Sequence, residues 1–211
     1  MSQETLDGAA VAAWMQRAAK SVAEHETALT DLDRAIGDGD HGANMHRGFT
    51  AVKGKLDSEA EQGLPAEVLK VVATTLISTV GGASGPLFGT AFLKGSMAVA
   101  GQESLDARGV AAFLRAAAEG VQARGKAEPG DKTMVDAWLP AAAAAETVAS
   151  NEGTALEALT AAAEAAKQGA VETEPLVAKK GRASYLGERA IGHRDPGAES
   201  TALLLAAGEQ R

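Results

Sequence analysis

The sequence predicts an all-α fold from its composition and its hydrophobic periodicity. Only 3% of the 211 residues are aromatic and only three are isoleucine, whereas alanine is abundant. Strands favour β-branched and aromatic residues and helices favour alanine, so this composition indicates helices nearly throughout the chain. Apolar residues also recur at helical spacing in several stretches. The 45% hydrophobic and 23% charged shares are typical of a folded globular chain.

Length and charge narrow the class of protein further. We expect one domain over residues 1–211, because that length suits a single hydrophobic core. No cysteine is present, which excludes disulfides and thiolate metal sites. The longest uncharged apolar stretch, Ala137–Ala145, contains Pro140 and is far shorter than the ~20 residues that span a bilayer. A cytoplasmic location follows as an expectation, with no membrane partner. The net charge of −8 disfavours nucleic acid as a partner.

The N-terminal half shows helical patterns in four stretches. The first helix begins behind a cap at Asp7, and its apolar residues from Val11 to Val22 follow i, i+3, i+4, i+7 spacing. Residues 42–56 and 86–100 are patterned less clearly. Between them, Val68–Val80 forms an i+4 row that a pair of glycines ends. Four helices are therefore predicted in this half.

The C-terminal half carries clearer helix boundaries. A helical face over Val110–Val121 ends near Gly125. The final helix is predicted to begin at Asp195–Pro196, a cap followed by proline in the first turn. Two capping boxes mark further helix starts: Thr133 with Asp136, and Thr154 with Glu157.

Three aspartates lie within eight residues, at Asp33, Asp38 and Asp40, with glycine at positions 37 and 39. Glycine permits tight turns that aim several side chains at one point. Two carboxylates ~4 Å apart repel by about 4 kcal/mol at an effective dielectric constant of 20, so their convergence indicates a cation between them. Oxygen ligands favour Mg²⁺ or Ca²⁺. The alternative is a solvated acidic turn whose charges point apart.

Three better-known motifs match this chain only in part, and we reject each of them. Gly37–Gly42 matches the dinucleotide fingerprint, but no strand precedes it. An EF-hand that starts at Asp38 would need glutamate where Phe49 stands. Gly120–Lys126 is similar to a P-loop, yet alanine replaces the serine or threonine that would bind magnesium.

The loop Gly81–Gly85 lies between two predicted helices, with Pro86 expected at the first position of the second helix. A glycine loop that leads into a helix N-terminus offers free backbone N–H groups and the positive end of the helix dipole to an anion. Ser84 adds a hydroxyl donor. The alternative is a flexible connector between packed helices.

A second type of phosphate-binding loop is basic. Lys179–Arg189 is the dense basic stretch of an otherwise acidic chain, and its charges alternate with Gly, Ser and Tyr as in a loop. Arginine suits bidentate phosphate contacts. The loop Arg124–Thr133 has a similar composition. The alternative for both is a solvated run of charges.

The four loops together indicate a metal–nucleotide complex. Phosphoryl transfer requires mainly positioning and charge neutralisation, which a hard metal ion and cationic donors supply. His41 lies beside the carboxylates, and three roles are open to it: a general base, a hydrogen-bond donor to phosphate, or a support for another ligand.

Four segments of the chain resemble the nucleotide-binding L subunit of dihydroxyacetone kinase (DhaL). They are Leu32–Met45, Gly81–Thr90, Gly125–Met134 and Lys180–Gly197. They occur in the order of that family, and the resemblance extends over essentially the whole chain. It implies a barrel of about eight antiparallel helices, with the nucleotide and two Mg²⁺ ions held by loops at one end.

The resemblance also implies roles for individual residues. Asp33, Asp38 and Asp40 would coordinate the two Mg²⁺ ions, and with His41 they would form the catalytic set. The residues that would bind ADP or ATP are His41, Gly42, Ala43, Asn44, Gly82, Ala83, Ser84, Gly125, Thr133, Met134, Arg182, Asp195, Pro196 and Gly197.

The same resemblance implies partners. In relatives that work with the sugar phosphotransferase system, bound ADP acts as a coenzyme that a phosphohistidine protein, the M subunit, recharges to ATP. The γ-phosphoryl group then passes to dihydroxyacetone held on a separate K subunit. Free ATP as the donor and another short ketose as the acceptor are the open alternatives. A homodimer is compatible with the sequence.

The alternative function, from another class of enzyme, is that of a stand-alone metal-dependent phosphohydrolase. Gly37–Gly42 faintly resembles metallophosphatase loops. Two-metal hydrolases, however, need several histidines or further acidic ligands, and this chain has four histidines in all. The phosphotransferase subunit is therefore the predicted function.

Overall fold

The computed structural model describes residues 4–58 and 63–209. Within these ranges the chain forms nine α-helices, one 3₁₀ helix and two short strands, so the prediction of an all-α fold is confirmed. The helices are α1 Gly8–Glu24, α2 Glu26–Ile36, α3 His41–Ser58, α4 Pro65–Thr79, α5 Ser84–Ala98, α6 Ala107–Gly125, α7 Val135–Ser150, α8 Ala155–Glu172 and α9 Pro196–Ala206. The 3₁₀ helix η1 covers Arg182–Ala190, and β1 Leu6–Asp7 pairs antiparallel with β2 Ser104–Leu105.

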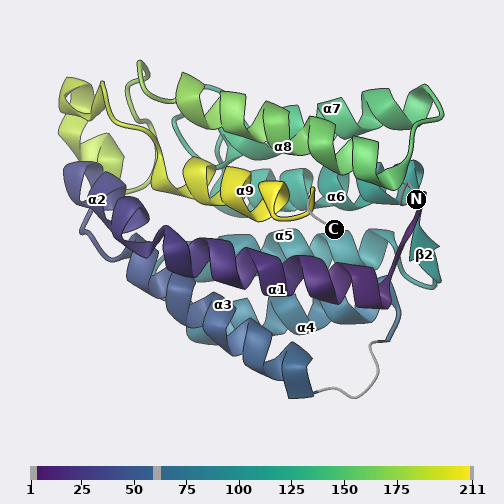
Figure 1. Ribbon diagram of the computed structural model, residues 1–211. Helices are drawn as coiled ribbons and strands as arrows, with labels where there is room; N and C mark the ends of the chain where they lie inside the picture. The colour runs from purple at the N-terminus through teal and green to yellow at the C-terminus, as the bar shows by residue number, and fades with distance from the viewer. Residues whose placement is uncertain (1–3, 59–62, 210–211) are drawn as a thin grey trace.

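Eight of these helices form a closed ring (Figure 1). Its order is α1, α3, α4, α5, α6, α7, α8 and α9, and α9 packs against α1 again. Short connections make the neighbours from α3 to α8 antiparallel, whereas α2 lies between α1 and α3 in the chain and a longer segment with η1 leads from α8 to α9. The helix α2 lies outside the ring, where it contacts α3, α9 and η1 at one end of the barrel. The barrel of about eight helices is thus present, with α2 added at the end that carries the predicted loops.

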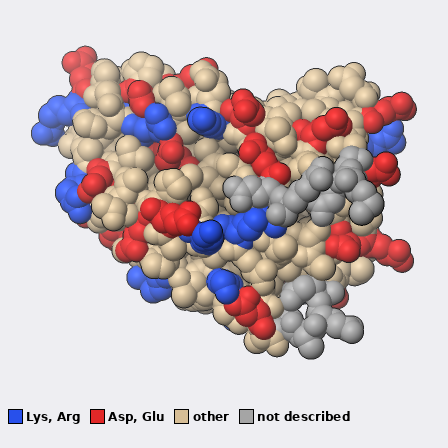
Figure 2. Space-filling model, in the orientation of Figure 1, with Lys and Arg blue, Asp and Glu red and all other residues tan. Residues whose placement is uncertain are grey.

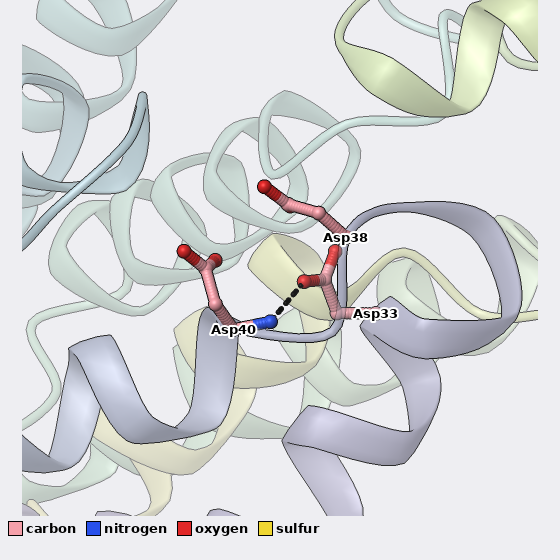
Figure 3. A group of neighbouring side chains, drawn as sticks. All are labelled: Asp33, Asp38 and Asp40. Atoms are coloured by element: carbon pink, nitrogen blue, oxygen red, sulfur yellow. Dashed lines mark hydrogen bonds between the residues drawn. The ribbon is translucent and has the colours of Figure 1, made fainter.

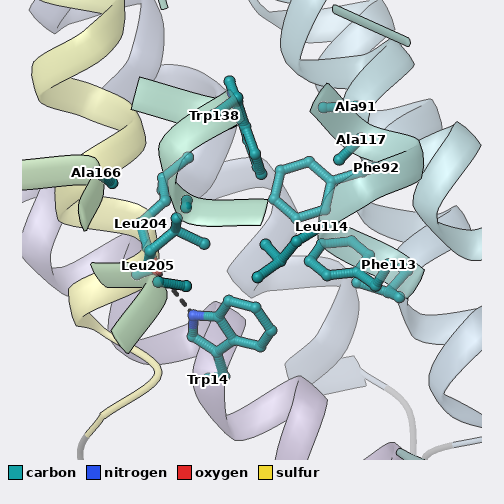
Figure 4. Close-up of a cluster of buried hydrophobic side chains, with 14 of the residues drawn as sticks. Trp14, Ala91, Phe92, Phe113, Leu114, Ala117, Trp138, Ala166, Leu204 and Leu205 are labelled. Carbon is teal, nitrogen blue, oxygen red and sulfur yellow. Dashed lines mark hydrogen bonds between the residues drawn. The ribbon is translucent and has the colours of Figure 1, made fainter. Parts of the chain in front are cut away.

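The interior of the ring is filled by a few large side chains among many alanines (Figure 4). Trp14 and Phe113 meet edge to face, with ring centroids 5.9 Å apart. The Trp14 indole N–H donates to the carbonyl of Leu204 at 2.8 Å and so joins α1 to α9. Small residues such as Ala117 and Ala166 are fully buried, which lets neighbouring helices approach closely. The core therefore closes the ring as well as filling it.

Several predicted helix starts are confirmed by their caps. The Asp7 carboxylate accepts from the Ala10 amide at 2.8 Å, and the box of Thr154 with Glu157 is complete. Asp195 caps α9 by accepting from the Ala198 amide at 2.7 Å. These short-range signals are readable in sequence because each involves residues three positions apart.

Other boundaries differ from the predictions. The Thr133 hydroxyl accepts from the Val135 amide instead of the Asp136 amide, so only the Asp136 carboxylate completes its half of the predicted box. The helix α5 begins at Ser84, two residues before the expected Pro86. Part of the basic stretch predicted as loop is the 3₁₀ helix η1.

Charged side chains of both signs are interspersed over the face of the molecule shown in Figure 2. No helix within the described ranges is both long enough and apolar enough to cross a bilayer.

Candidate metal–nucleotide site

Three carboxylates meet where α2 gives way to α3 (Figure 3). Asp33 lies in the last turn of α2, and Asp38 and Asp40 lie in the turn that follows. One carboxylate oxygen from each of the three lies within 4.8 Å of the others. The predicted convergence of these side chains is therefore present, and the three carboxylates do not point apart as the alternative would require.

Backbone geometry explains why the turn gathers them. Asp33 Oδ2 accepts from the amides of Asp40 at 2.9 Å and His41 at 3.2 Å, so it caps the start of α3 while it faces the cluster. A Cβ atom at Gly37 would lie 2.1 Å from Asp33 Oδ1, and Gly39 has a φ of +74°. Only glycine meets both requirements without strain.

The cluster suits a hard divalent cation. Three like charges this close repel one another, and oxygen ligands alone are the set that Mg²⁺ prefers. The guanidinium of Arg182, from η1, lies 2.9 Å from the Asp38 carboxylate. Cationic and anionic groups from two distant segments therefore meet at one point.

His41 is buried beside the cluster and is held through both ring nitrogens. Its Nε2 lies 2.7 Å from the Ser200 hydroxyl on α9, and its Nδ1 lies 3.1 Å from the Ser84 hydroxyl on α5. Burial lowers the pKa of the imidazole, against the opposing effect of Asp33 and Asp40. With both nitrogens bonded to hydroxyl groups, His41 fixes Ser84 at the site and does not join the carboxylate cluster.

A cavity of about 590 Å³ adjoins the cluster. The segments that border it come from the α2–α3 turn, the loop before α5, the end of α6, the start of α7, η1 and the start of α9. The predicted site residues that border it are Asp33, Asp38, Asp40, His41, Asn44, Gly82, Ala83, Ser84, Gly125, Thr133, Met134, Arg182, Asp195, Pro196 and Gly197. One cavity thus joins the loops that the sequence singled out separately.

Two predicted residues lie outside this border. Gly42 is buried between helices, where a Cβ atom would approach the carbonyl of Glu26 on α2 to 2.0 Å. Ala43 is exposed on α3. Gly42 therefore allows α2 and α3 to pack closely, and this contact places Asp33 next to the turn.

The cavity is chemically divided. Its carboxylates, Ser84 and the free N–H groups at the start of α5 form a polar part that fits metal-bound phosphates. Another part is lined by apolar side chains, including Leu87, Val121 and Met134. Apolar walls with a few polar groups are typical of nucleotide sites.

Sequence reasoning did not name individually four residues that matter here, although Arg124, Lys132 and Lys180 lie in the basic loops that it singled out. Ser200 is fully buried behind His41 and belongs to no motif, so only the folded chain reveals it. Arg124 and Lys180 border the cavity, and Lys132 borders it although Lys132 is only 1% exposed.

Burial raises the pKa of Asp195 at the cavity wall to about 7, an effect that its neighbour Asp136 reinforces.

Comparison with known proteins places this geometry in a family. Residues 35–210 match the DAK2 domain family. The chain is 45% identical over 192 residues to the ADP-binding subunit DhaL of the PEP-dependent dihydroxyacetone kinase of Escherichia coli K12, with 91% of each chain covered. It is 47% identical over 192 residues to the ADP-binding subunit DhaL of PEP-dependent dihydroxyacetone kinase 1 of Listeria innocua, with 91% of this chain and 90% of that one covered.

A solved structure agrees with the fold. The dihydroxyacetone kinase of C. freundii, crystallised in complex with AMP-PNP and Mg²⁺, superposes with a TM-score of 0.72 at 26% identity. The alignment covers 99% of this chain and 35% of the C. freundii chain, so this chain corresponds to about a third of that kinase. By its sequence and its helical barrel, the chain belongs to the DAK2 domain family and, within it, to the DhaL subunits of dihydroxyacetone kinases.

Proposed function

We propose that this chain is the ADP-binding subunit of a phosphotransferase-system-dependent dihydroxyacetone kinase. It holds ADP with two Mg²⁺ ions, receives a phosphoryl group from a phosphohistidine protein, and passes it to dihydroxyacetone on a separate K subunit. The observation that carries the proposal is the gathering of Asp33, Asp38 and Asp40 at a cavity that also contains a helix N-terminus and an arginine. The names of the bacterial relatives, which describe ADP-binding subunits, support it.

The three aspartates would hold the metal ions. When bound there, Mg²⁺ would neutralise part of the charge of the phosphates. Arg182 already reaches this point through its contact with Asp38, so its guanidinium is placed to bind phosphate oxygens. Ser84, held by His41, adds a hydroxyl at the start of α5, and the apolar wall with Leu87 and Met134 excludes water beside the base.

The acceptor would come from another polypeptide. A cavity of about 590 Å³ is of the size that one nucleotide fills, and Asp33, Asp38, Asp40, Ser84 and Arg182 on its polar border are assigned above to the metal ions and phosphates. Dihydroxyacetone would therefore be presented by the K subunit, and the M subunit would recharge ADP. A single domain over residues 1–211 and the cytoplasmic location expected from the sequence belong to the same proposal.

The substitution Asp38→Asn tests the proposal. It removes one cluster charge with almost no change of shape, and we expect loss of co-purifying nucleotide and of phosphoryl transfer with unchanged helical content. Asp31→Asn is a matched control, because Asp31 is a carboxylate in the middle of α2 that does not border the cavity. Native mass spectrometry would detect ADP and two magnesium ions on the unmodified chain and on the control.

Two results would contradict the proposal. One is full transfer activity of the Asp38→Asn variant in the presence of the K and M subunits. The other is release of phosphate from simple esters by the isolated chain, which would instead favour the phosphohydrolase. Within residues 4–58 and 63–209 the carboxylate cluster contains no histidine, and both nitrogens of His41 are bonded to hydroxyl groups, so this geometry does not favour the hydrolase.

A further inference from the structure

Lys132 is an unusual lysine. It borders the cavity, yet only 1% of it is exposed, and its backbone is left-handed with φ of 60°. Lysine is almost never fully buried without partners, and a non-glycine residue in the left-handed region is uncommon. Strained residues of this kind persist where the surrounding structure fixes them, often at functional sites.

The ammonium group of Lys132 is surrounded by backbone carbonyls. It donates to the carbonyl of Thr173 at 2.6 Å, to that of Glu174 at 3.3 Å and to that of His193. These acceptors use all three of its N–H groups. None of the three acceptor residues borders the cavity, so the side chain points away from the ligand space. The ammonium group of Lys132 therefore acts on the cavity through other residues.

The carbonyl acceptors belong to two segments. Thr173 and Glu174 follow the C-terminus of α8, where the helix dipole favours a cation. His193 lies just before the Asp195–Gly197 turn that starts α9 and borders the cavity. The Thr173 hydroxyl also accepts from the Asp195 amide at 2.9 Å, which ties the same two segments together.

Asp131, which precedes Lys132, extends these contacts to the basic segment that begins at Lys179. The Asp131 carbonyl accepts from the Lys179 amide at 3.0 Å, and the Asp131 carboxylate lies 3.5 Å from the Lys179 ammonium. Lys179 directly precedes the cavity residues Lys180 to Arg182. The dipeptide Asp131–Lys132 is thus bonded to both C-terminal segments that border the cavity.

We propose that Lys132 is a positioning residue for the nucleotide cavity, whose buried ammonium holds the Asp195–Gly197 turn against the Thr133–Met134 loop. The two face each other closely, since a Cβ atom at Gly197 would lie 3.1 Å from the Met134 Cε. This inference rests on the proposed function, because the ligand whose wall is positioned is Mg·ADP. The electrostatic attraction of Asp195 and Glu174 favours the charged ammonium, against the burial that lowers the pKa of Lys132.

The substitution Lys132→Met tests the proposal, because it keeps most of the unbranched side chain and removes the three donors. We expect the affinity for Mg·ADP, measured by calorimetry, to fall by about tenfold or more, which corresponds to about 1.4 kcal/mol. Lys126→Met is the matched control, because Lys126 also has a left-handed backbone, with φ of 49°, but is exposed and does not border the cavity. Hydrogen exchange should quicken at the amides of residues 192–198 in Lys132→Met and stay unchanged in the α2–α3 turn.

A milder variant covers the case in which Lys132→Met does not fold. Thr173→Val removes the hydroxyl that accepts from the Asp195 amide and donates to the Ala170 carbonyl, with little change of shape and none of charge. It should also weaken Mg·ADP binding and expose the amides of 192–198. The proposal is overturned if a folded variant binds Mg·ADP within about twofold of the control, or if exchange quickens throughout the protein, since a general loss of stability is then the cause. If the unmodified chain itself fails to bind Mg·ADP, the proposed function fails too.

Discussion

Asp195 combines two roles that set opposite demands on its charge. As the cap of α9 its carboxylate accepts from the Ala198 amide, which favours the ionised form. Its surroundings at the cavity wall disfavour that form more strongly, and burial raises its pKa from 3.8 to about 7. Ionisation of the Asp195 carboxylate therefore lowers the stability of the folded protein.

This cost predicts a pH dependence of stability. A carboxyl group whose pKa is higher in the folded protein contributes stability that is fully present below its unfolded pKa of 3.8 and is lost as pH rises through about 7. The Asp195→Asn variant keeps a capping side chain and lacks this titration. Its free energy of unfolding, relative to the unmodified chain, should therefore rise with pH over this window, with a slope of at most about 1.4 kcal/mol per pH unit.

Urea unfolding at several pH values measures the difference directly. The variant shares every other titrating group with the unmodified chain, so subtraction of the two curves isolates Asp195. A difference that stays flat from acid to neutral pH would show that Asp195 titrates at an ordinary pKa.

A substitution of Arg182 should affect the binding of Mg·ADP without affecting the stability of the fold. Its pair with Asp38 is 2.9 Å long, but 70% of the Arg182 side chain is exposed, and exposed ion pairs contribute less than about 1 kcal/mol. Arg182→Met should therefore leave the melting temperature nearly unchanged while it lowers the affinity for Mg·ADP several-fold through the lost phosphate contact. Calorimetric titration with parallel thermal melts checks both parts, and Arg189→Met, on the same 3₁₀ helix but outside the cavity border, is the control.

At this scale the sequence predicted the metal cluster better than the residues that support it. Asp33, Asp38 and Asp40 lie within eight residues, so the glycine turns between them were enough to predict a convergence of their side chains around a cation. Ser200 and Lys132 act through partners more than 40 residues away, and each looks like an ordinary polar residue in sequence. Long-range hydrogen bonds leave no local pattern to read.

At the scale of elements, the contact between α7 and α8 depends on a proline and a glycine. Pro140 lies inside α7 and has no N–H group, so the carbonyl of Asp136 lacks its usual helical partner. That carbonyl faces Gly169 on α8, where a Cβ atom would approach it to 2.0 Å. The absence of a side chain at Gly169 therefore sets how closely the two helices pack at the cavity end of α7.

A pair of glycine substitutions tests this. Gly169→Ala should lower the free energy of unfolding by about 2 kcal/mol, because overpacking against a backbone carbonyl outweighs the better helix propensity of alanine. Gly54→Ala, at an exposed position of α3 with no atom within 4 Å of the added Cβ, should raise it by roughly 0.5–1 kcal/mol. Chemical denaturation measures both, and equal effects of the two changes would rule out the steric argument.

Elements with strong local signals were predicted and elements without them were not. The helices α1, α4 and α6 have regular apolar faces, and the caps at Asp7 and Asp195 mark the starts of α1 and α9. No signal indicated α2, which is separated from α1 by a break at His25. The helix η1 was predicted as loop because its basic residues lack an apolar face, and only Ala190 of that helix is buried.

At the scale of the whole molecule, the cavity joins segments that are far apart in the chain. It is bordered by residues from the α2–α3 turn, the loop before α5, the α6–α7 connection, η1 and the start of α9. The ring closes between α1 and α9, where Trp14 donates to the Leu204 carbonyl and Arg17 donates to the Ala207 carbonyl. A ligand in the cavity would therefore connect the loops at the open end of a barrel whose interior is already packed.

Ligand binding should consequently stabilise the entire barrel, and only when metal and nucleotide are both present. A ligand that binds the folded state alone adds RT ln(1 + [L]/Kd), about 2.7 kcal/mol at a concentration of 100 Kd. We expect Mg²⁺ with ADP to raise the melting temperature by several degrees, and either component alone to have little effect, because the carboxylates repel phosphate without the ion and hold the ion weakly without phosphate. Removal of the metal with a chelator should reverse the shift, and Asp38→Asn should lack it. An equal shift from ADP in the presence of the chelator would show that the nucleotide binds without the carboxylate cluster, and the phosphate end of the site would then have to be sought elsewhere on the barrel.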